Sequence, residues 1–359
     1  MKLFKKHHPI KFYKRHWKWT VPLTVVLLFL AGGGTYAFIQ SNKPKPVEPE
    51  KKVEIKPPEL PHYFSKLTGR EVSEPLSLKP VTGVMIENSP EARPQSGLYD
   101  ADLVFESVAE GGITRFLALY QESEPKEIGP VRSVRIHFAN LAVGYDASLA
   151  HVGGSDSALS LIRSNKDLDE FANGGSYWRS PNRYAPHNVF TSFDNLNALN
   201  SAKGFTKSDF VGFSRKADEP RNPADATSIY IPVSAFNFDS QIKYQPETNS
   251  YLRFMAGKPH LDANGKQINP KVVVVLNVDH NTVSDTNGYR YPQILSSGSA
   301  TIYQDGTKTE ATWAKKDAAS PLKLTDASGN DMKLNPGQTW VTIIPTNNKP
   351  VVEEPIQSN

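Results

Sequence analysis

A charge-free apolar segment near the N-terminus most constrains how this chain can fold. Residues 21–39, VPLTVVLLFLAGGGTYAFI, contain no charged side chain. As a helix rising about 1.5 Å per residue they span roughly 28 Å, the hydrocarbon thickness of a bilayer. The 20 residues before them carry seven lysines and arginines and no acid. Because basic residues stay on the cytoplasmic side, the pattern predicts a transmembrane helix with a cytoplasmic N-terminus and folded domains outside the cytoplasm.

The alternative for this segment is a cleaved signal peptide. The apolar run is longer than a usual signal core, and the glycines at 32–34 precede no clear A-x-A cleavage site. We therefore expect a retained anchor, in which Pro22 would fall in the first helical turn, where a missing N–H is tolerated. The chain has no cysteine, which excludes disulfides, thiolate metal sites and a lipid-modified cysteine anchor.

The charge distribution bears on the partners. The formal net charge is +4, and removing the seven cations of the N-terminal tail leaves about −3 for the rest. Nothing in that remainder suggests a nucleic-acid partner. We expect the membrane as one partner, through residues 21–40, and a cell-wall or envelope ligand as another.

Composition and hydrophobic periodicity divide the chain into six parts. Strands and helices alternate in the first folded part, whereas almost every signal in the second is a strand. The fold class is therefore α+β, a layered sheet and helix domain followed by a mostly β domain, with a polar hinge around 216–225 between them. The predicted parts are a basic cytoplasmic tail (1–20), a transmembrane helix (21–40), a Pro/Lys/Glu-rich linker (41–75), an N-terminal α+β domain (76–215), a C-terminal β-rich domain (226–346) and a disordered tail (347–359).

Two strands joined by Ala109-Glu110-Gly111-Gly112 place an arginine in an apolar run. Arg115 begins the apolar part of the second strand, residues 113–120. A four-residue loop would set Glu106 opposite Arg115, whereas a two-residue Gly-Gly turn would set Val108 there. Because burying an unpaired charge costs several kcal/mol, we favour the first register.

Gly129-Pro130 is expected to open a helix whose apolar stripe contains Val131, Val134, Phe138 and Leu141. Arg132 and Arg135 would then lie three residues apart on one side of its first turns. Cations there oppose the helix dipole, so a bound anion would interact favourably with both arginines and the free N–H groups. Local counting finds no carboxylate partner for either arginine.

Basic, aromatic and histidine side chains cluster in loops and at strand ends of the first domain, where sites are usually built. Tyr177 to Asn188, YWRSPNRYAPHN, combines aromatic rings with cations and could hold a sugar bearing an anionic group. The alternative is an internal salt-bridge network with no ligand. The predicted ligand-binding residues are Arg93, Arg115, Arg132, Arg135, His151, Arg179, Arg183, His187 and Asn188.

Catalytic chemistry has weaker sequence support. His151, His187 and Glu110 are the candidates for general acid–base work. Ser155 lies between a strand and a helix, but the closing glycine of G-x-S-x-G is missing and a helix N-cap explains it. The histidines show no metal-ligand spacing, so we expect neither a metal nor a cofactor.

Several motifs in order resemble the YerB-like family of bacterial envelope proteins, which carries the DUF3048 domain. They are ARPQSGL (92–98), EGGITRF (110–116), GPVRSVR (129–135), YDA (145–147), HVGGS (151–155), APHN (185–188), DGTKTEATWAK (305–315) and LNPGQTWV (334–341). The resemblance implies an exported, anchored protein with an α+β first domain and a strand-rich second domain. Many members look like lipoproteins held by an N-terminal cysteine, which this chain lacks. The family supplies no activity to assign to these residues.

Three functions remain open at this point. The leading hypothesis is a membrane-anchored extracytoplasmic protein that binds an anionic or glycan envelope ligand at an Arg/His-lined cleft of the first domain. The second is an envelope hydrolase or transferase, with His151 or His187 as base and Glu106 or Glu110 as acid. The third is a scaffold for another membrane or wall protein, in which the arginines are purely structural.

Overall fold

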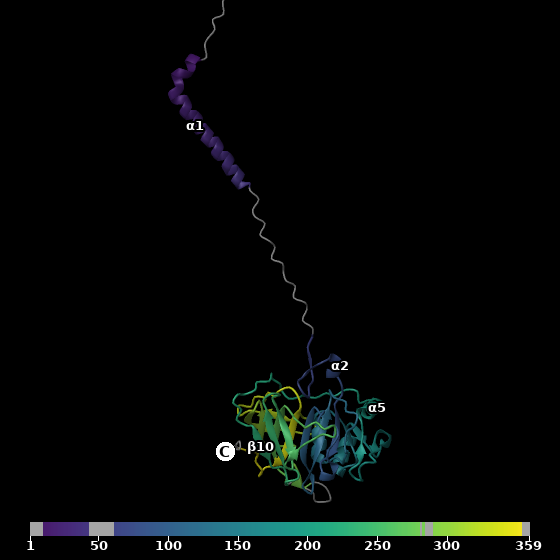
Figure 1. Cartoon of the computed structure of the whole chain (residues 1–359). Coiled ribbons are helices and arrows are strands. Elements are labelled where there is room, and N and C mark those ends of the chain that lie inside the picture. The colour runs from purple at the N-terminus through teal and green to yellow at the C-terminus, as the bar shows by residue number, and fades with distance from the viewer. Residues whose placement is uncertain (1–9, 43–60, 281, 284–289, 354–359) are drawn as a thin grey trace, which may run out of the picture. The chain divides into compact units, whose positions relative to one another are not determined.

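The computed structural model describes residues 10–42, 61–280, 282–283 and 290–353, and separates a unit that ends at Leu60 from a compact unit, Pro61–Asn359. In the first unit, α1 spans Ile10–Ser41 (Figure 1). Its stretch Pro22–Ser41 has a mean hydropathy of 1.8 and is long enough to cross a membrane. Pro22 lies inside this helix rather than in its first turn, because the helix continues N-terminally to Ile10. Residues 1–9 of the predicted tail and 43–60 of the predicted linker lie outside the described residues.

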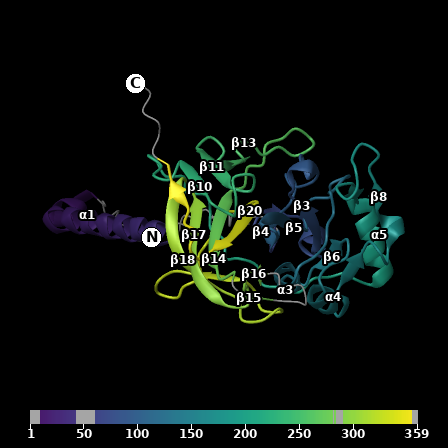
Figure 2. The same cartoon turned by 90° about the horizontal axis from the view of Figure 1, so that it is seen from below.

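One ten-stranded sheet forms the centre of the compact unit (Figure 2). Its order is β19-β18-β17-β14-β20-β4-β5-β3-β6-β7. The neighbours β14–β20, β20–β4, β3–β6 and β6–β7 are parallel, and the other pairs are antiparallel. The strands are β3 (Thr82–Glu87), β4 (Leu103–Glu110), β5 (Ile113–Tyr120), β6 (Ser148–His151), β7 (Asp167–Asp169), β14 (Val272–Val278), β17 (Ser297–Gln304), β18 (Thr307–Ala314), β19 (Lys323–Thr325) and β20 (Thr339–Pro345).

A second, antiparallel sheet has the order β13-β12-β11-β10-β21. It comprises β10 (Ser228–Ile231), β11 (Ser240–Gln245), β12 (Ser250–Met255), β13 (Lys258–Pro259) and β21 (Val351–Val352). The longer helices are α3 (Ile136–Gly144), α4 (Asp156–Arg163) and α5 (Phe193–Lys203). The remaining short elements are β1 (Tyr63–Phe64), β2 (Glu71–Val72), α2 (Glu74–Ser77), η1 (Pro90–Ala92), η2 (Gly174–Ser176), β8 (Trp178–Arg179), β9 (Val189–Phe190), β15 (Thr282–Val283) and β16 (Arg290–Tyr291).

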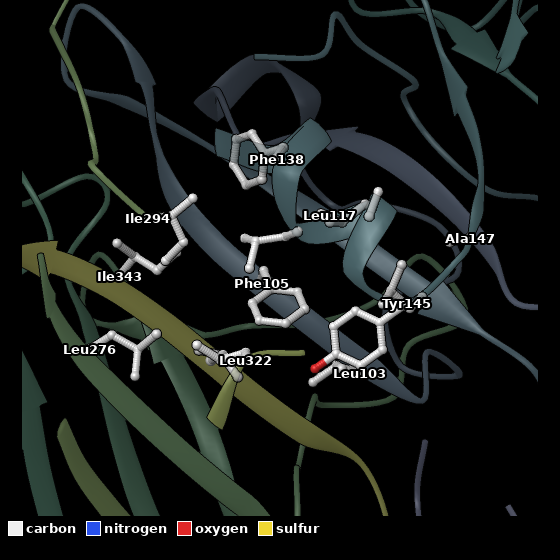
Figure 3. Close-up of a cluster of buried hydrophobic side chains, with 14 of the residues drawn as sticks. Leu103, Phe105, Leu117, Phe138, Tyr145, Ala147, Leu276, Ile294, Leu322 and Ile343 are labelled. Carbon is white, nitrogen blue, oxygen red and sulfur yellow. The ribbon is translucent and has the colours of Figure 1, made fainter. Parts of the chain in front are cut away.

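The central sheet has a hydrophobic core on each face. On one face α3 and α4 pack over the sheet, with Phe138 of α3 above Phe105 and Leu117 (Figure 3). On the other face lie α5 and the five-stranded sheet. The run KVVVV explains how one strand serves both cores, because alternate side chains such as Val273 and Val274 point to opposite faces. A continuous apolar run is typical of such a doubly covered strand.

The α+β class predicted from the sequence is confirmed, whereas the boundaries between the predicted parts differ in detail. The two folded parts share the central sheet, because β20 lies parallel to β4. The compact unit starts at Pro61 rather than 76, and Leu67 is fully buried. The expected hinge is anchored, since Arg221 N donates to Asp305 O at 2.9 Å. In the expected disordered tail, β21 pairs with β10.

Candidate functional site

Glu87, the last residue of β3, is the centre of a polar cluster. Its carboxylate is almost completely buried, and Oε1 accepts a hydrogen bond from Ser89 Oγ at 3.0 Å. The same oxygen lies 3.0 Å from Nδ1 of His187, which comes from the loop before β9. Oε2 lies 3.4 Å from Nε of Arg132, an ion-pair contact without a hydrogen bond. Glu87 therefore orients a histidine and faces an arginine.

Glu110 forms the second half of the cluster and contacts two arginines. Its two oxygens lie 2.7 Å from Arg115 Nη2 and 2.5 Å from Arg135 Nη2. Burial alone would raise the pKa of Glu110, but the two guanidinium groups outweigh it and lower that pKa below its usual value. Burial, followed by the charge of Arg135, lowers the pKa of Arg115 to about 10. Arg115 remains charged at neutral pH and also donates to Ser133 O at 2.9 Å.

The hairpin register differs from the expected one. Arg115 lies opposite Ser107, and Glu106 lies opposite Phe116. The turn is the two-residue Gly111-Gly112 alternative, and an irregularity between Val108 and Glu110 shifts the pairing by one residue. The predicted Glu106–Arg115 pair is therefore wrong, and Glu110 supplies the carboxylate instead.

The segment after Gly129-Pro130 is not yet helical, because its backbone hydrogen-bonds with strands. Arg132 N donates to Met85 O of β3, and Val152 N donates to Arg132 O. The helix α3 begins only at Ile136, with Arg135 as its N-cap residue. The expectation of two arginines in the first helical turns is wrong. So is the expectation that they lack partners, since Glu87 and Glu110 lie nearby.

Three other predicted arginines mainly hold loops together. Arg183 donates to the carbonyl oxygens of Ala92 at 2.8 Å and Pro94 at 2.5 Å. Arg179 donates to Asn188 Oδ1 at 3.1 Å, and its Nη2 lies 3.9 Å from a carboxylate oxygen of Glu170. Arg93 donates to neutral oxygens of Asn88 and Asn237. The loop residues are therefore brought close to η1, but much of their hydrogen-bonding capacity is used internally.

His151 at the end of β6 is fully buried, with both ring nitrogens close to oxygen atoms. Nδ1 lies 2.9 Å from Gly153 O, and Nε2 lies 3.0 Å from Asp167 Oδ1. His151 thus has no free nitrogen for proton transfer. His187 differs, because its side chain is 24% exposed and only Nδ1 is engaged with Glu87 and Ser89.

The cleft expected to be lined by Arg115, Arg132, Arg135, Arg179, Arg183 and His187 does not correspond to any of the three principal cavities found among the described residues. The largest, about 800 Å³, includes Arg93 from the predicted set. Most of its lining comes from the second folded part, where the sequence indicated no site. Within the described residues, no three histidine, cysteine, aspartate or glutamate side chains converge to hold a metal ion.

A buried ion pair between the two folded parts was not predicted. Arg253 Nη2 lies 2.5 Å from Glu106 Oε2, and both side chains are essentially inaccessible. Glu106 Oε2 also accepts from Trp340 Nε1 at 3.1 Å. Arg253 Nη1 donates to Nδ1 of His260, so Nε2 of that ring carries the proton that faces Gln95 Oε1 at 3.3 Å. An arginine between apolar residues in the strand YLRFM was the available sequence signal.

Comparisons with known proteins now identify the family. Residues 67–206 match the "Protein of unknown function (DUF3048) N-terminal domain", and residues 229–341 match the corresponding C-terminal domain. The chain therefore belongs to the DUF3048 family. In this chain both matched segments contribute to one central sheet.

One relative of this class is YerB. The chain is 30% identical over 291 residues to the "Putative lipoprotein YerB" of Bacillus subtilis (strain 168), which covers 78% of this chain and 85% of the relative. The crystal structure of YerB from Bacillus subtilis matches with a TM-score of 0.72 and 27% identity, over 80% of this chain and 99% of the other. A fifth of this chain has no counterpart in that match. Because Pro61–Asn359 is a compact unit separate from the one that contains α1, we expect it to fold without the helix.

Proposed function

We propose that this DUF3048 protein is a membrane-anchored extracytoplasmic binding protein for an anionic group of a cell-envelope polymer. The apolar stretch Pro22–Ser41 supports anchoring, and so does the name of the relative, a lipoprotein. Because this chain has no cysteine, the helix takes the place of a lipid anchor. The basic residues before the helix favour a cytoplasmic N-terminus, a single membrane crossing and folded parts on the outer side.

The observation that carries the proposal is the lack of hydrogen bonds to the Arg132 guanidinium among the described residues. Its guanidinium is 23% exposed and makes no hydrogen bond to any described residue. Arg115, Arg132 and Arg135 interact electrostatically, yet only Glu87 and Glu110 face them as carboxylates. The cluster thus has a surplus positive charge and an unused planar set of N–H donors, which suits a phosphate or carboxylate.

The test is retention on purified bacterial cell walls, before and after removal of their phosphate-containing polymers. The compact part should sediment with intact walls and be released by rising salt. Arg132→Gln should weaken retention about ten-fold or more, the expected loss of one charge-assisted contact. Lys126→Gln is the matched control, because this exposed lysine pairs with Asp194, outside the cluster. Equal retention of both variants would refute the Arg132 site.

A second candidate function rests on the Glu87–His187 pair. A buried carboxylate that holds Nδ1 of a partly exposed histidine leaves Nε2 free to act as a general base. Glu110 is a poor partner acid, because its lowered pKa keeps it ionised at neutral pH. Release of soluble fragments from walls, lost in His187→Gln but retained in His151→Gln with a normal melting temperature, would establish this activity. Absence of release across pH 5–9 would exclude it.

A further inference from the structure

The largest cavity lies where η1 meets the β12–β13 hairpin and the loop that follows it. Its volume is about 800 Å³, within the usual range of small-molecule sites. The walls are mostly apolar, and two of the apolar side chains are solvent-accessible: Phe236 is 66% exposed and Leu261 is 42% exposed. Exposed apolar side chains around a concavity indicate a surface that can be covered by an apolar molecule.

Arg93 lines this cavity without a carboxylate partner. Its hydrogen bonds go to neutral oxygens, from Nε to Asn88 Oδ1 at 3.1 Å and from Nη2 to the carbonyls of Asn88 and Asn237 at 2.9 and 2.8 Å. Nη1 makes no hydrogen bond to any described residue. Burial and then the charge of Arg253 lower the pKa of Arg93 to about 10, against the opposing charges of Glu106 and Glu91. Arg93 therefore stays a cation at neutral pH, and among the described residues no carboxylate forms an ion pair with it.

The other charged groups of the cavity do not supply the missing anion. Lys258 is exposed and adds a second cation. Asp262 is the cavity's one described carboxylate, and it is turned toward backbone donors: Oδ2 accepts from Tyr99 N at 3.0 Å and Oδ1 from Asn264 N at 3.2 Å. It forms no ion pair with Arg93. The neutral ring of His260 contributes no charge, since burial holds its pKa well below the usual value.

We propose that this cavity binds an amphipathic anion of lipid type, with its carboxylate or phosphate at Arg93 and its apolar chain against Phe236 and Leu261. The positive charge of Arg93 selects an anionic head group, and the apolar walls of the cavity select a ligand with an apolar chain. The site goes beyond the wall-binding surface proposed above, because Arg132 does not line it. Arg93 and Arg132 therefore separate the two ideas.

The experiment is a calorimetric titration of the compact part, Pro61–Asn359, with dodecanoate and with dodecyl phosphate, each below its critical micelle concentration. Dodecanol is the uncharged control probe. We expect saturable one-to-one binding of at least one anionic probe, and binding of dodecanol weaker by about ten-fold or more. Stronger binding of dodecanoate indicates a carboxylate head, and stronger binding of dodecyl phosphate indicates a phosphate head.

Three variants distinguish the contributions. Arg93→Gln should weaken anion binding about ten-fold and leave dodecanol binding unchanged, whereas Phe236→Ser, at an exposed position, should weaken both. Arg132→Gln should change neither. If Arg93→Gln is unstable in thermal melts, Lys258→Gln is the second charge variant, with a smaller loss of anion affinity. The proposal is overturned if neither anionic probe binds saturably, or if neither binds more tightly than dodecanol.

Discussion

Breaking the buried ion pair that joins the two folded parts should be one of the most destabilising single changes in the chain. In Arg253→Met the carboxylate of Glu106 loses its cationic partner and keeps only Trp340 Nε1 and a long contact from Thr342. Its Oε1 already lacks a hydrogen bond. Removing one partner of a buried pair costs about 3–5 kcal/mol, because an uncompensated charge stays buried. We expect Arg253→Met to fall in that range.

The assay is urea unfolding of the compact part, monitored by tryptophan fluorescence. Lys126→Met is the matched control, because it breaks the exposed pair with Asp194 and should cost less than about 1 kcal/mol. The double variant Glu106→Gln/Arg253→Met should recover part of the lost free energy of unfolding, since neither charge of this pair then remains buried. The reasoning is refuted if Arg253→Met costs no more than Lys126→Met.

Two further predictions concern charge at buried positions. Glu110→Gln leaves Arg115 and Arg135 facing each other without a carboxylate, and should cost about 2–4 kcal/mol in the same assay. Because the folded-state pKa of Glu110 is lowered, its contribution should disappear as pH falls through that pKa, so the wild type and Glu110→Gln should converge in acid. Burial depresses the pKa of His137, so below about pH 6.5 the unfolded chain binds a proton that the folded chain does not. The free energy of unfolding should therefore decrease by about 1.4 kcal/mol for each pH unit below that value. His137→Leu should remove this slope, and an unchanged slope in the variant would contradict the prediction.

The sequence predicted the elements whose signal is local. The apolar stretch of α1 and the strand β5 both lie where the sequence predicted them, because each contains a continuous apolar run. The start of α3 was placed too early because the residues after Gly129-Pro130 form backbone hydrogen bonds with β3 and with Val152, just beyond β6, which no local pattern reveals.

The ion pairs of the first folded part were harder to predict, because most of their partners lie outside the range of local counting. Glu106 and Arg253 are 147 positions apart, and local counting instead paired Glu106 with the nearest arginine across the hairpin. The one-residue irregularity near Ala109 then decided which carboxylate reaches Arg115. A one-residue shift reverses the face of every side chain, so register errors of this size change the assignment of a site completely.

The two matched family segments belong to one compact unit, and we expect them to fold together for a physical reason. Separating them would uncover the edge of β4 where β20 now pairs, and would leave Glu106 buried without Arg253. An open strand edge and an unpaired buried charge both favour aggregation or unfolding. The cavity at Arg93 is lined by both segments as well, so its geometry depends on the same junction. Any ligand that binds only the joined state would stabilise it, by an amount that grows with the logarithm of the ratio of ligand concentration to Kd.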